Sequence, residues 1–338
     1  MRAFSLGRAM VDLGHDVTLM AGRSLPGLKK IESFKDGVKI LQMSDVSPKI
    51  IRHGGLSLFD IVGRCRSILK SEFDIIHGFD HRLAVSIPSL MGKFRENIPF
   101  VSDWADLWGW EGIAAERNVI ARWTLGLKDQ YLERFVRKKA DFITPISVNM
   151  ANRTLDLGIP KCKIGIISVG ANADVIRPHS KTNMREKYGF PQHAKILVYT
   201  GFTEFDTSLL SQTFIALSEI YPGVRLLITG RKSPRLSKSF ARAGVSKYVV
   251  HMGNLPYEQL GEVMSCGDIM LLPYTDRPLN VARFPNRIGD YLAVGRPIAT
   301  NPTGDMKSFI KQNPVGILAD EDPVSFAFGI RSLLENVP

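Results

Sequence analysis

The residues best suited to chemistry lie between positions 283 and 300, in the run RFPNRIGDYLAVGRPIAT. Pro285 suits the first turn of a helix, and Gly295 suits the left-handed cap that ends one. The predicted helix opens with free N–H groups and a partial positive charge, beside the full charges of Arg283 and Arg287. A helix end of this kind is suited to binding a diphosphate.

A carboxylate lies further along the same helix. Asp290 follows Arg287 by three residues, which places both side chains on one face. Acidic residues in dinucleotide-binding folds accept hydroxyl protons from a ribose, and Asp290 is a candidate for that role. The same spacing allows a surface ion pair between the two residues, which would contribute little to stability. The pattern leaves both interpretations open.

Two histidines are candidates for proton exchange. His77 ends a predicted strand, and His81 follows it after a short loop. The pKa of histidine lies near neutrality, so either side chain can exchange a proton with an acceptor hydroxyl. A buried structural histidine is an equally good interpretation of each position.

The run SDWADLWGWEG at 102–112 places carboxylates and tryptophans directly after a predicted strand. Aromatic faces stack on sugar rings, and carboxylates accept hydrogen bonds from sugar hydroxyls. We therefore expect acceptor or sugar contacts from Asp103, Trp104 and Trp108, and a catalytic role for Asp106. Tryptophans in this run are equally able to serve as core anchors.

These candidates need a scaffold, and the periodicity of the chain predicts a parallel α/β fold. Short apolar runs typical of strands alternate with segments whose apolar positions recur every three or four residues. Strands are predicted at 17–21, 73–78, 99–103, 140–147 and 164–170, and at 195–201, 224–230, 248–253, 268–274, 296–301 and 316–320. The clearest helices are predicted at 56–72, at about 115–139 and at 323–335.

A polar segment at 170–191 separates the two halves, and Pro178 and Pro191 interrupt it. We therefore predict one domain at 1–175 and a second at 176–338. The first three predicted strands of the second half all end in glycine. Backbone free of side chains at the carboxyl ends of parallel strands is where a doubly wound sheet admits a ligand.

Composition indicates a folded protein of ordinary domains, because 44% of the 338 residues are hydrophobic. The sequence contains no run of about 20 apolar residues, which makes a membrane span improbable. The three cysteines are far apart and form no C-x-x-C motif. We therefore expect a cytoplasmic protein without a disulfide framework or a zinc site.

The net charge of +11 predicts anionic partners. Such a surface attracts phosphorylated substrates or an anionic membrane, and we expect peripheral binding at the inner face of a membrane. Solvated helix faces are the alternative interpretation of the basic clusters. No recognised nucleic-acid module accompanies the charge, so no specific nucleic-acid partner is expected. The clusters are Arg64, Arg66 and Lys70, and Arg134, Arg137, Lys138 and Lys139.

The sequence resembles the GT-B glycosyltransferases, and in particular their large retaining family 4. The run FPNRIGDYLAVGRPIAT, which follows CGDIMLLPY, is similar to the donor-binding signature of that family. Weaker matches follow in the family's order: LGHDVTLMAG at 13–22, FDIIHGFD at 73–80, ADFITPIS at 140–147 and ISVGANADVIRP at 167–178. The resemblance implies two Rossmann-like doubly wound domains that face a cleft. It also implies a nucleotide-diphospho-sugar donor on the second domain, a hydroxyl acceptor on the first, and no metal or other cofactor.

The resemblance also implies roles for single residues. The family spaces two acids eight residues apart, and Asp290 matches the second of them, the expected ribose ligand. Ala282 occupies the place of the first acid, and Asn280 and Arg283 are the candidates to replace it. The chain begins after the family's first strand and glycine-rich turn, and it ends before the helix that crosses back to the first domain.

The phosphate-binding turn departs from the family pattern as well. Gly201 is matched, but Phe202 stands where the family often has arginine, so Arg283 and Arg287 are expected to compensate. Arg231 and Asn286 complete the expected donor-binding set.

Two other functions remain compatible with these residues. A sugar-nucleotide epimerase of the same architecture would bind the donor without forming a glycosidic bond. A sugar-nucleotide-binding protein without catalytic activity would be consistent with Ala282 and with the missing termini.

Overall fold

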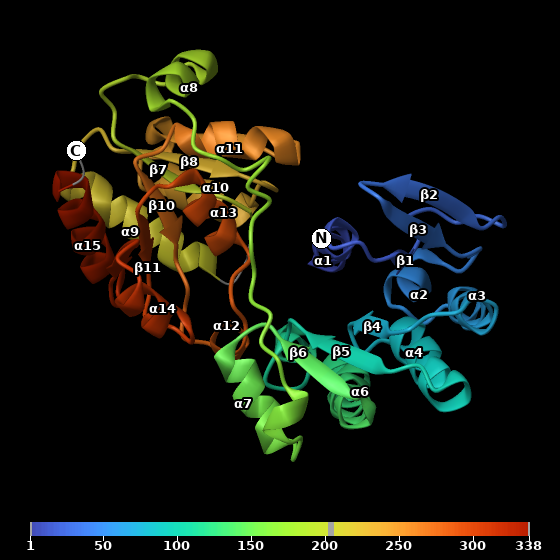
Figure 1. The fold of residues 1–338 in the computed structure, drawn as a ribbon. Coiled ribbons are helices and arrows are strands. Elements are labelled where there is room, and N and C mark those ends of the chain that lie inside the picture. The colour runs from blue at the N-terminus through green and yellow to red at the C-terminus, as the bar shows by residue number, and fades with distance from the viewer. Residues whose placement is uncertain (1, 202–205, 337–338) are drawn as a thin grey trace. The chain divides into compact units, whose positions relative to one another are not determined.

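The computed structural model describes residues 2–201 and 206–336 (Figure 1). The chain forms two compact units, Met1–Ser168 and Val169–Pro338, whereas the sequence analysis places the domain boundary after residue 175. Strands and helices alternate through both units, which confirms the predicted α/β class. Among the described residues, no helix is both long and apolar enough to cross a membrane.

The first unit contains two separate three-stranded sheets, in the orders β1-β3-β2 and β4-β5-β6. The strands are β1 (Thr18–Ala21), β2 (Ile31–Lys35), β3 (Val38–Gln42), β4 (Ile76–Phe79), β5 (Phe100–Trp104) and β6 (Phe142–Pro145). The helices are α1 (Arg2–Asp12), α2 (Lys49–His53), α3 (Leu58–Leu69), α4 (Leu83–Glu96), α5 (Val119–Ala121), α6 (Leu127–Lys139) and α7 (Val148–Asp156). Short turns of helix are η1 (Ile113–Glu116), η2 (Arg122–Gly126) and η3 (Lys161–Lys163).

The sequence analysis missed β2 and β3, which form an antiparallel hairpin. Asp36 and Gly37 make its two-residue turn, with φ of 48° and 76°, as in the type I′ turns that suit hairpins. All of β2 is exposed to solvent, so its side chains lack the apolar pattern of a core strand. The strand predicted at 164–170 was wrong in most of its length, because only Ile164 forms a bridge, to Ile143 in β6.

The second unit contains one six-stranded parallel sheet, in the order β12-β11-β10-β7-β8-β9. Its strands confirm all six predictions: β7 (Ile196–Tyr199), β8 (Arg225–Thr229), β9 (Val249–Gly253), β10 (Ile269–Leu272), β11 (Ile298–Thr300) and β12 (Gly316–Leu318). The order reverses between β7 and β10, and ligands of doubly wound sheets bind outside the carboxyl ends at such a point.

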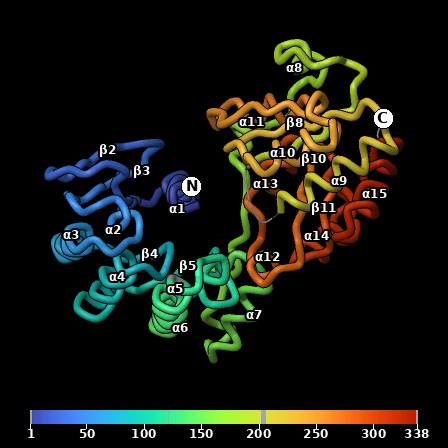
Figure 2. The backbone as a smooth tube through the Cα atoms, turned by 180° about the vertical axis from the view of Figure 1, so that it is seen from behind, coloured from blue at the N-terminus to red at the C-terminus, as the bar shows by residue number. Residues whose placement is uncertain are grey.

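The helices of this unit, within the described residues, are α8 (Lys181–Tyr188), α9 (Thr207–Ile220), α10 (Pro234–Arg242), α11 (Tyr257–Ser265), α12 (Pro278–Ala282), α13 (Arg287–Val294), α14 (Met306–Gln312) and α15 (Pro323–Asn336), with the turn η5 (Ser246–Tyr248). The helices α9 and α15 lie side by side, as both backbone views show (Figure 1, Figure 2). Their apolar faces join those of α10, β7, β8 and β10 in one buried cluster that includes Phe214, Phe240 and Phe326.

The predicted helix in the 283–300 run is confirmed as α13. It ends at Val294, and Gly295 takes the left-handed conformation with φ of 69°. Tyr291 fastens this helix to the sheet, since its hydroxyl accepts the Thr200 N–H at 3.0 Å and donates to the Leu271 carbonyl at 3.1 Å.

Candidate functional site

Two glycines, one after β7 and one after β8, lie next to each other at the carboxyl ends of these strands. Gly201 follows β7 with φ of 74°, and Gly230 follows β8 with φ of 103°. A Cβ atom on Gly230 would lie 3.1 Å from the backbone of Gly201, tighter than most Cβ contacts in proteins, and would add to the strain of its positive φ. Both turns therefore need glycine, and their bare backbone is open to a ligand at the point where the strand order reverses.

Arg287 brings a positive charge to this point. It is the first residue of α13, and its guanidinium carbon lies 4.8 Å from the centre of the Tyr199 ring at the end of β7. Its Nη2 would lie 3.9 Å from a Cβ atom on Gly201. Burial opposes the charge, but the phenol groups of Tyr199 and Tyr291 raise the pKa of Arg287, so the guanidinium stays protonated. The positive charge that the sequence predicts at the start of this helix therefore lies beside the turn at Gly201.

A hydrogen-bond network joins Asp206, at the start of α9, to residues between β10 and α13. The Asn280 amide donates to Asp206 Oδ1 at 3.2 Å, and its oxygen accepts from Arg283 Nη2 at 2.7 Å. The Thr275 hydroxyl donates to the same Asp206 oxygen at 2.8 Å. Asn280 is therefore buried and holds Arg283 by a hydrogen bond. Ala282, which precedes Arg283, is fully buried. This arrangement does not fit Asn280 as a replacement for the family's first acid.

Asp290 lies on the next turn of α13. Its carboxylate accepts a hydrogen bond of 3.4 Å from the hydroxyl of Tyr257 on α11. Burial raises the pKa of Asp290 to about 6, although the hydrogen bond from Tyr257 lowers it. An ion pair would lower the pKa of this carboxyl, so the raised value argues against the surface pair with Arg287.

A hollow of about 250 Å³ opens beside β8 and β9. Arg231, Lys232 and Ser233 line it at the start of α10, together with His251 of β9 and Tyr199 of β7. Of these residues only Arg231 was predicted from the sequence, and Tyr199 and His251 join it from separate strands through the fold. Asn286 is exposed and precedes α13 without a side-chain capping bond. Phe202, the remaining expected donor contact, lies outside the described residues.

In the first unit, four polar side chains from α1, β4, β5 and β6 meet in one cluster. Arg2 of α1 donates to both oxygens of Asp103, from Nη2 to Oδ1 at 2.9 Å and from Nε to Oδ2 at 3.0 Å. Thr144 donates to Asp103 Oδ1 at 2.9 Å, and its Oγ1 lies 3.1 Å from His77 Nε2. The sequence analysis found His77 and Asp103 but missed Arg2 and Thr144, whose partners are distant along the chain.

The surroundings of His77 disfavour its protonated form. Burial lowers the pKa of His77, the carboxylate of Asp103 opposes that effect, and the charge of Arg2 adds to it. Asp103 is buried and already bonded to Arg2 and Thr144, so it positions the cluster and does not present a free carboxylate to a sugar.

His81 is fully buried, unlike a residue that exchanges protons with an acceptor. Its Nδ1 lies 3.1 Å from Asp80 Oδ1 and its Nε2 lies 3.6 Å from Asp129 Oδ1. Burial opposes protonation, but these two carboxylates raise the pKa of His81 above its ordinary value. The same pairing contributes to a pKa of about 2 for Asp129. The structural interpretation of His81 therefore fits better than the catalytic one.

The tryptophan run has two kinds of member. Trp104 is buried, and its Nε1 donates to Glu133 Oε1 at 2.7 Å, so the expectation that it stacks on a sugar was wrong. Trp108 is half-buried, with the guanidinium of Arg82 4.9 Å from its ring centre. Asp106, the expected catalytic acid, is half-buried in the same loop.

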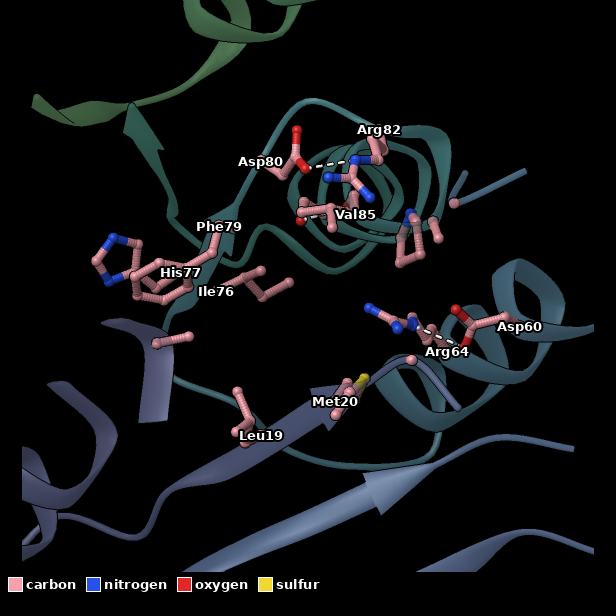
Figure 3. Close-up of a pocket in the computed structure, with 18 of the residues that line it drawn as sticks. Leu19, Met20, Asp60, Arg64, Ile76, His77, Phe79, Asp80, Arg82 and Val85 are labelled. Atoms are coloured by element: carbon pink, nitrogen blue, oxygen red, sulfur yellow. Dashed lines mark hydrogen bonds and ion pairs between the residues drawn. The ribbon is translucent and has the colours of Figure 1, made fainter. Parts of the chain in front are cut away.

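A cavity of about 720 Å³ separates the two sheets of the first unit. Figure 3 shows Leu19 and Met20 of β1 on one side and Ile76, His77 and Phe79 of β4 on the other. Among the described residues, β1 pairs only with β3 and β4 pairs only with β5, so one edge of each strand borders this cavity. Ion pairs between Asp60 and Arg64 and between Asp80 and Arg82 lie at its margin (Figure 3).

Two α/β units, one of which places glycine turns and a cation at the switch point of a parallel sheet, fit the GT-B architecture. Residues 1–175 match the family described as Glycosyltransferase Family 4, and residues 194–336 match Glycosyl transferases group 1. The chain belongs to glycosyltransferase family 4.

Known proteins resemble the chain over most of its length. The D-inositol 3-phosphate glycosyltransferase of Thermobispora bispora is 21% identical over 98% of this chain and 80% of that protein. Sucrose-phosphate synthase from Thermosynechococcus elongatus has a TM-score of 0.74 at 16% identity, covering 98% of this chain and 83% of its own. WaaG, a glycosyltransferase involved in lipopolysaccharide biosynthesis, has a TM-score of 0.71 at 16% identity, covering 99% and 86%. Anabaena HepE in complex with UDP-glucose has a TM-score of 0.65 at 13% identity, covering 95% and 90%.

Proposed function

We propose that this glycosyltransferase moves a sugar from a nucleotide-diphospho-sugar to a hydroxyl acceptor, with retention of the anomeric configuration and without a bound metal ion. The proposal rests above all on the meeting of Gly201, Gly230 and Arg287 at the switch point of the six-stranded sheet. Bare backbone lets a diphosphate approach closely, and a guanidinium there is charged at any physiological pH.

The chemistry asks the site to stabilise a leaving group. The bond between the anomeric carbon and the diphosphate oxygen breaks, the acceptor oxygen bonds to that carbon, and the nucleoside diphosphate leaves with its added negative charge. Arg287 and the N–H groups at the start of α13 offset this charge, which is an electrostatic role that needs no metal. Asp290 accepts hydrogen bonds from the ribose hydroxyls, as its place on α13 supports.

The acceptor binds the first unit in this proposal, where His77 is the residue suited to receive its proton. Burial lowers the pKa of His77, so its imidazole is neutral and able to accept a proton near pH 7. The contact with Thr144 at 3.1 Å fixes the ring, and Arg2 and Asp103 hold Thr144 in place.

Uridine nucleotides are the first donors to test, because HepE was solved in complex with UDP-glucose and shares the fold. Calorimetry with UDP-, GDP- and dTDP-sugars should identify one donor. Asp290→Ala should then weaken its binding at least about tenfold, because charge-assisted hydrogen bonds to the ribose are lost. Glu335→Ala, which removes an exposed carboxylate of α15 in the same unit, is the matched control and should bind normally.

Turnover separates the alternatives. Incubation with the identified donor and a panel of hydroxyl acceptors should give a glycosidic product and free nucleoside diphosphate. An isomerised nucleotide sugar without acceptor would instead support an epimerase. Equal donor affinity of Asp290→Ala and the unsubstituted protein would contradict the ribose assignment, and no binding of any nucleotide sugar would contradict the proposal itself.

A further inference from the structure

Large apolar side chains are exposed to solvent along α5, η2 and the first turns of α6. Val119, Ile120, Trp123, Leu127 and Tyr131 expose between 48% and 79% of their surface. Apolar exposure of this extent in one segment is characteristic of an interaction surface. We call this set, together with Arg122, Arg134 and Lys138, the 119–138 surface.

These apolar residues stay exposed because other residues of the segment already fill the side that faces the core. A Cβ atom on Gly126 would lie 3.1 Å from Ala114 and 3.2 Å from Trp110, so η2 packs closely there. On α6, Glu133 and Val136 are buried. Leu127 and Tyr131 recur at the helical spacing on the opposite side and have no core left to enter.

The acidic side chains of this segment are buried, whereas several of its basic side chains are exposed. The acidic residues between positions 117 and 139 are Asp129 and Glu133, and both are buried. Asp129 pairs with Arg117 at 2.7 Å, and Glu133 accepts from Trp104, so neither acid reaches the outer face. Arg122, Arg134 and Lys138 are all exposed. The outer face is therefore cationic and apolar at once.

We propose that the 119–138 surface docks this enzyme on an anionic phospholipid membrane. Aliphatic side chains and the rings of Trp123 and Tyr131 suit the boundary between headgroups and acyl chains, where amphipathic aromatics are favoured. Arg122, Arg134 and Lys138 would meet anionic headgroups. Nucleic acid would satisfy the cations but offers little to Val119 and Ile120, and an uncharged apolar partner would leave the cations without counterparts.

The structure divides the two basic clusters expected from the sequence into buried and exposed members. Arg64 is buried and pairs with Asp60 at 2.9 Å, and Arg137 is buried against the ring of Trp104. Neither is able to reach a membrane. Arg66 and Lys70 of the first cluster stay exposed, as do Arg134, Lys138 and Lys139 of the second, and only the second group lies beside the exposed apolar residues of the 119–138 surface.

Flotation with vesicles tests the proposal. The protein should float with vesicles that contain phosphatidylglycerol and not with phosphatidylcholine vesicles, and added salt should weaken the association. Two variants should each lower the bound fraction at least about tenfold. One removes apolar contacts by Ile120→Ser, Trp123→Ser and Leu127→Ser. The other removes charge by Arg122→Ser, Arg134→Ser and Lys138→Ser.

The matched control lies on α10 of the second unit. Arg235, Lys238 and Arg242 are also exposed cations, but the large apolar residues of α10, Leu236 and Phe240, are buried. Changing these three cations to serine removes the same charge and should leave flotation within about threefold of the unsubstituted protein. Circular dichroism should show that every variant is folded.

Several results would overturn the proposal. Flotation of the unsubstituted protein with neither kind of vesicle, or equally with both, would do so. An equal loss in the α10 control would show that charge alone acts, without this surface. A change of molar mass in light scattering on substitution of Ile120, Trp123 and Leu127 would show that the surface joins two copies of the chain. A second observation, a blue shift of tryptophan emission on vesicles that Trp123→Ser abolishes, should accompany docking.

Discussion

Burial and hydrogen bonding oppose each other at the carboxyl group of Asp290. Burial on α13 disfavours its charged form and raises its pKa to about 6, while the hydrogen bond from Tyr257 favours the charge and lowers the pKa. A carboxylate held in this way is costly for the free enzyme. Two ribose hydroxyls that donate hydrogen bonds to the carboxylate would offset this desolvation cost, so the buried carboxylate would favour binding of the ribose.

Stability should therefore depend on pH through Asp290. Because its folded pKa is raised above the ordinary value of 3.8, the folded state binds the proton more tightly than the unfolded chain. The carboxyl thus destabilises the fold above about pH 6, and the effect fades as pH falls toward 3.8. Asp290→Asn should raise the free energy of unfolding by about 1–2 kcal/mol at pH 7.5, and by less at pH 5.

Urea titrations at the two pH values measure this difference. The same variant should bind the nucleotide sugar more weakly, so stability and affinity should move in opposite directions. A gain in stability that is equal at both pH values would show that the carboxyl does not titrate in this range. A loss of stability at pH 7.5 would contradict the assignment outright.

At the level of elements, the second unit was predictable because each strand is a compact apolar run, and the first three of these runs end at glycine. The Asp36-Gly37 turn carried a hairpin signal, yet the hairpin was missed, because β2 is exposed along its whole length and only Val38 and Leu41 of β3 enter the core. For the site, spacing along one helix was enough to associate Arg287 with Asp290. Spacing was not enough for Arg2 and Asp103, which are 101 residues apart and meet only through the fold.

The loop after β5 depends on a single residue of α6. The carboxylate of Glu133 is buried and accepts hydrogen bonds from Trp104 Nε1 at 2.7 Å, from the Trp108 N–H at 3.0 Å and from the Gly109 N–H at 2.9 Å. Three donors converge on one group, so no side chain of another type can satisfy them all. This carboxylate therefore positions the backbone at Trp108 and Gly109.

Glu133→Gln should lower the free energy of unfolding by about 2–3 kcal/mol, because the amide places its own donors against one of these N–H groups. Glu111→Gln is the matched control, since the Glu111 carboxylate is exposed and makes a surface ion pair with Arg153 at 3.0 Å. The control should change stability by less than about 0.5 kcal/mol. Chemical denaturation measures both variants, and equal small effects would show that the loop does not depend on Glu133.

On the scale of the whole molecule, the two units differ in how completely they are packed. The second unit has one continuous six-stranded sheet with a large core cluster against it. The first unit has two sheets of three strands with a cavity of about 720 Å³ between them. Cavities and unpaired strand edges both reduce the stability of a fold. The residues proposed to hold the donor all belong to the second unit.

We therefore expect the chain to unfold in two steps in urea, the first unit before the second. All four tryptophans, at positions 104, 108, 110 and 123, belong to the first unit, so tryptophan emission follows that unit alone, whereas circular dichroism follows both. The bound nucleotide sugar should stabilise only the second step, by about 2.7 kcal/mol at a concentration 100 times its Kd. Residues 169–338 expressed alone should show this second step and bind the donor within about fivefold of the full chain's affinity. Coincident transitions by both probes, shifted together by the donor, would mean that the two units fold as one cooperative body, and the donor site would then depend on both.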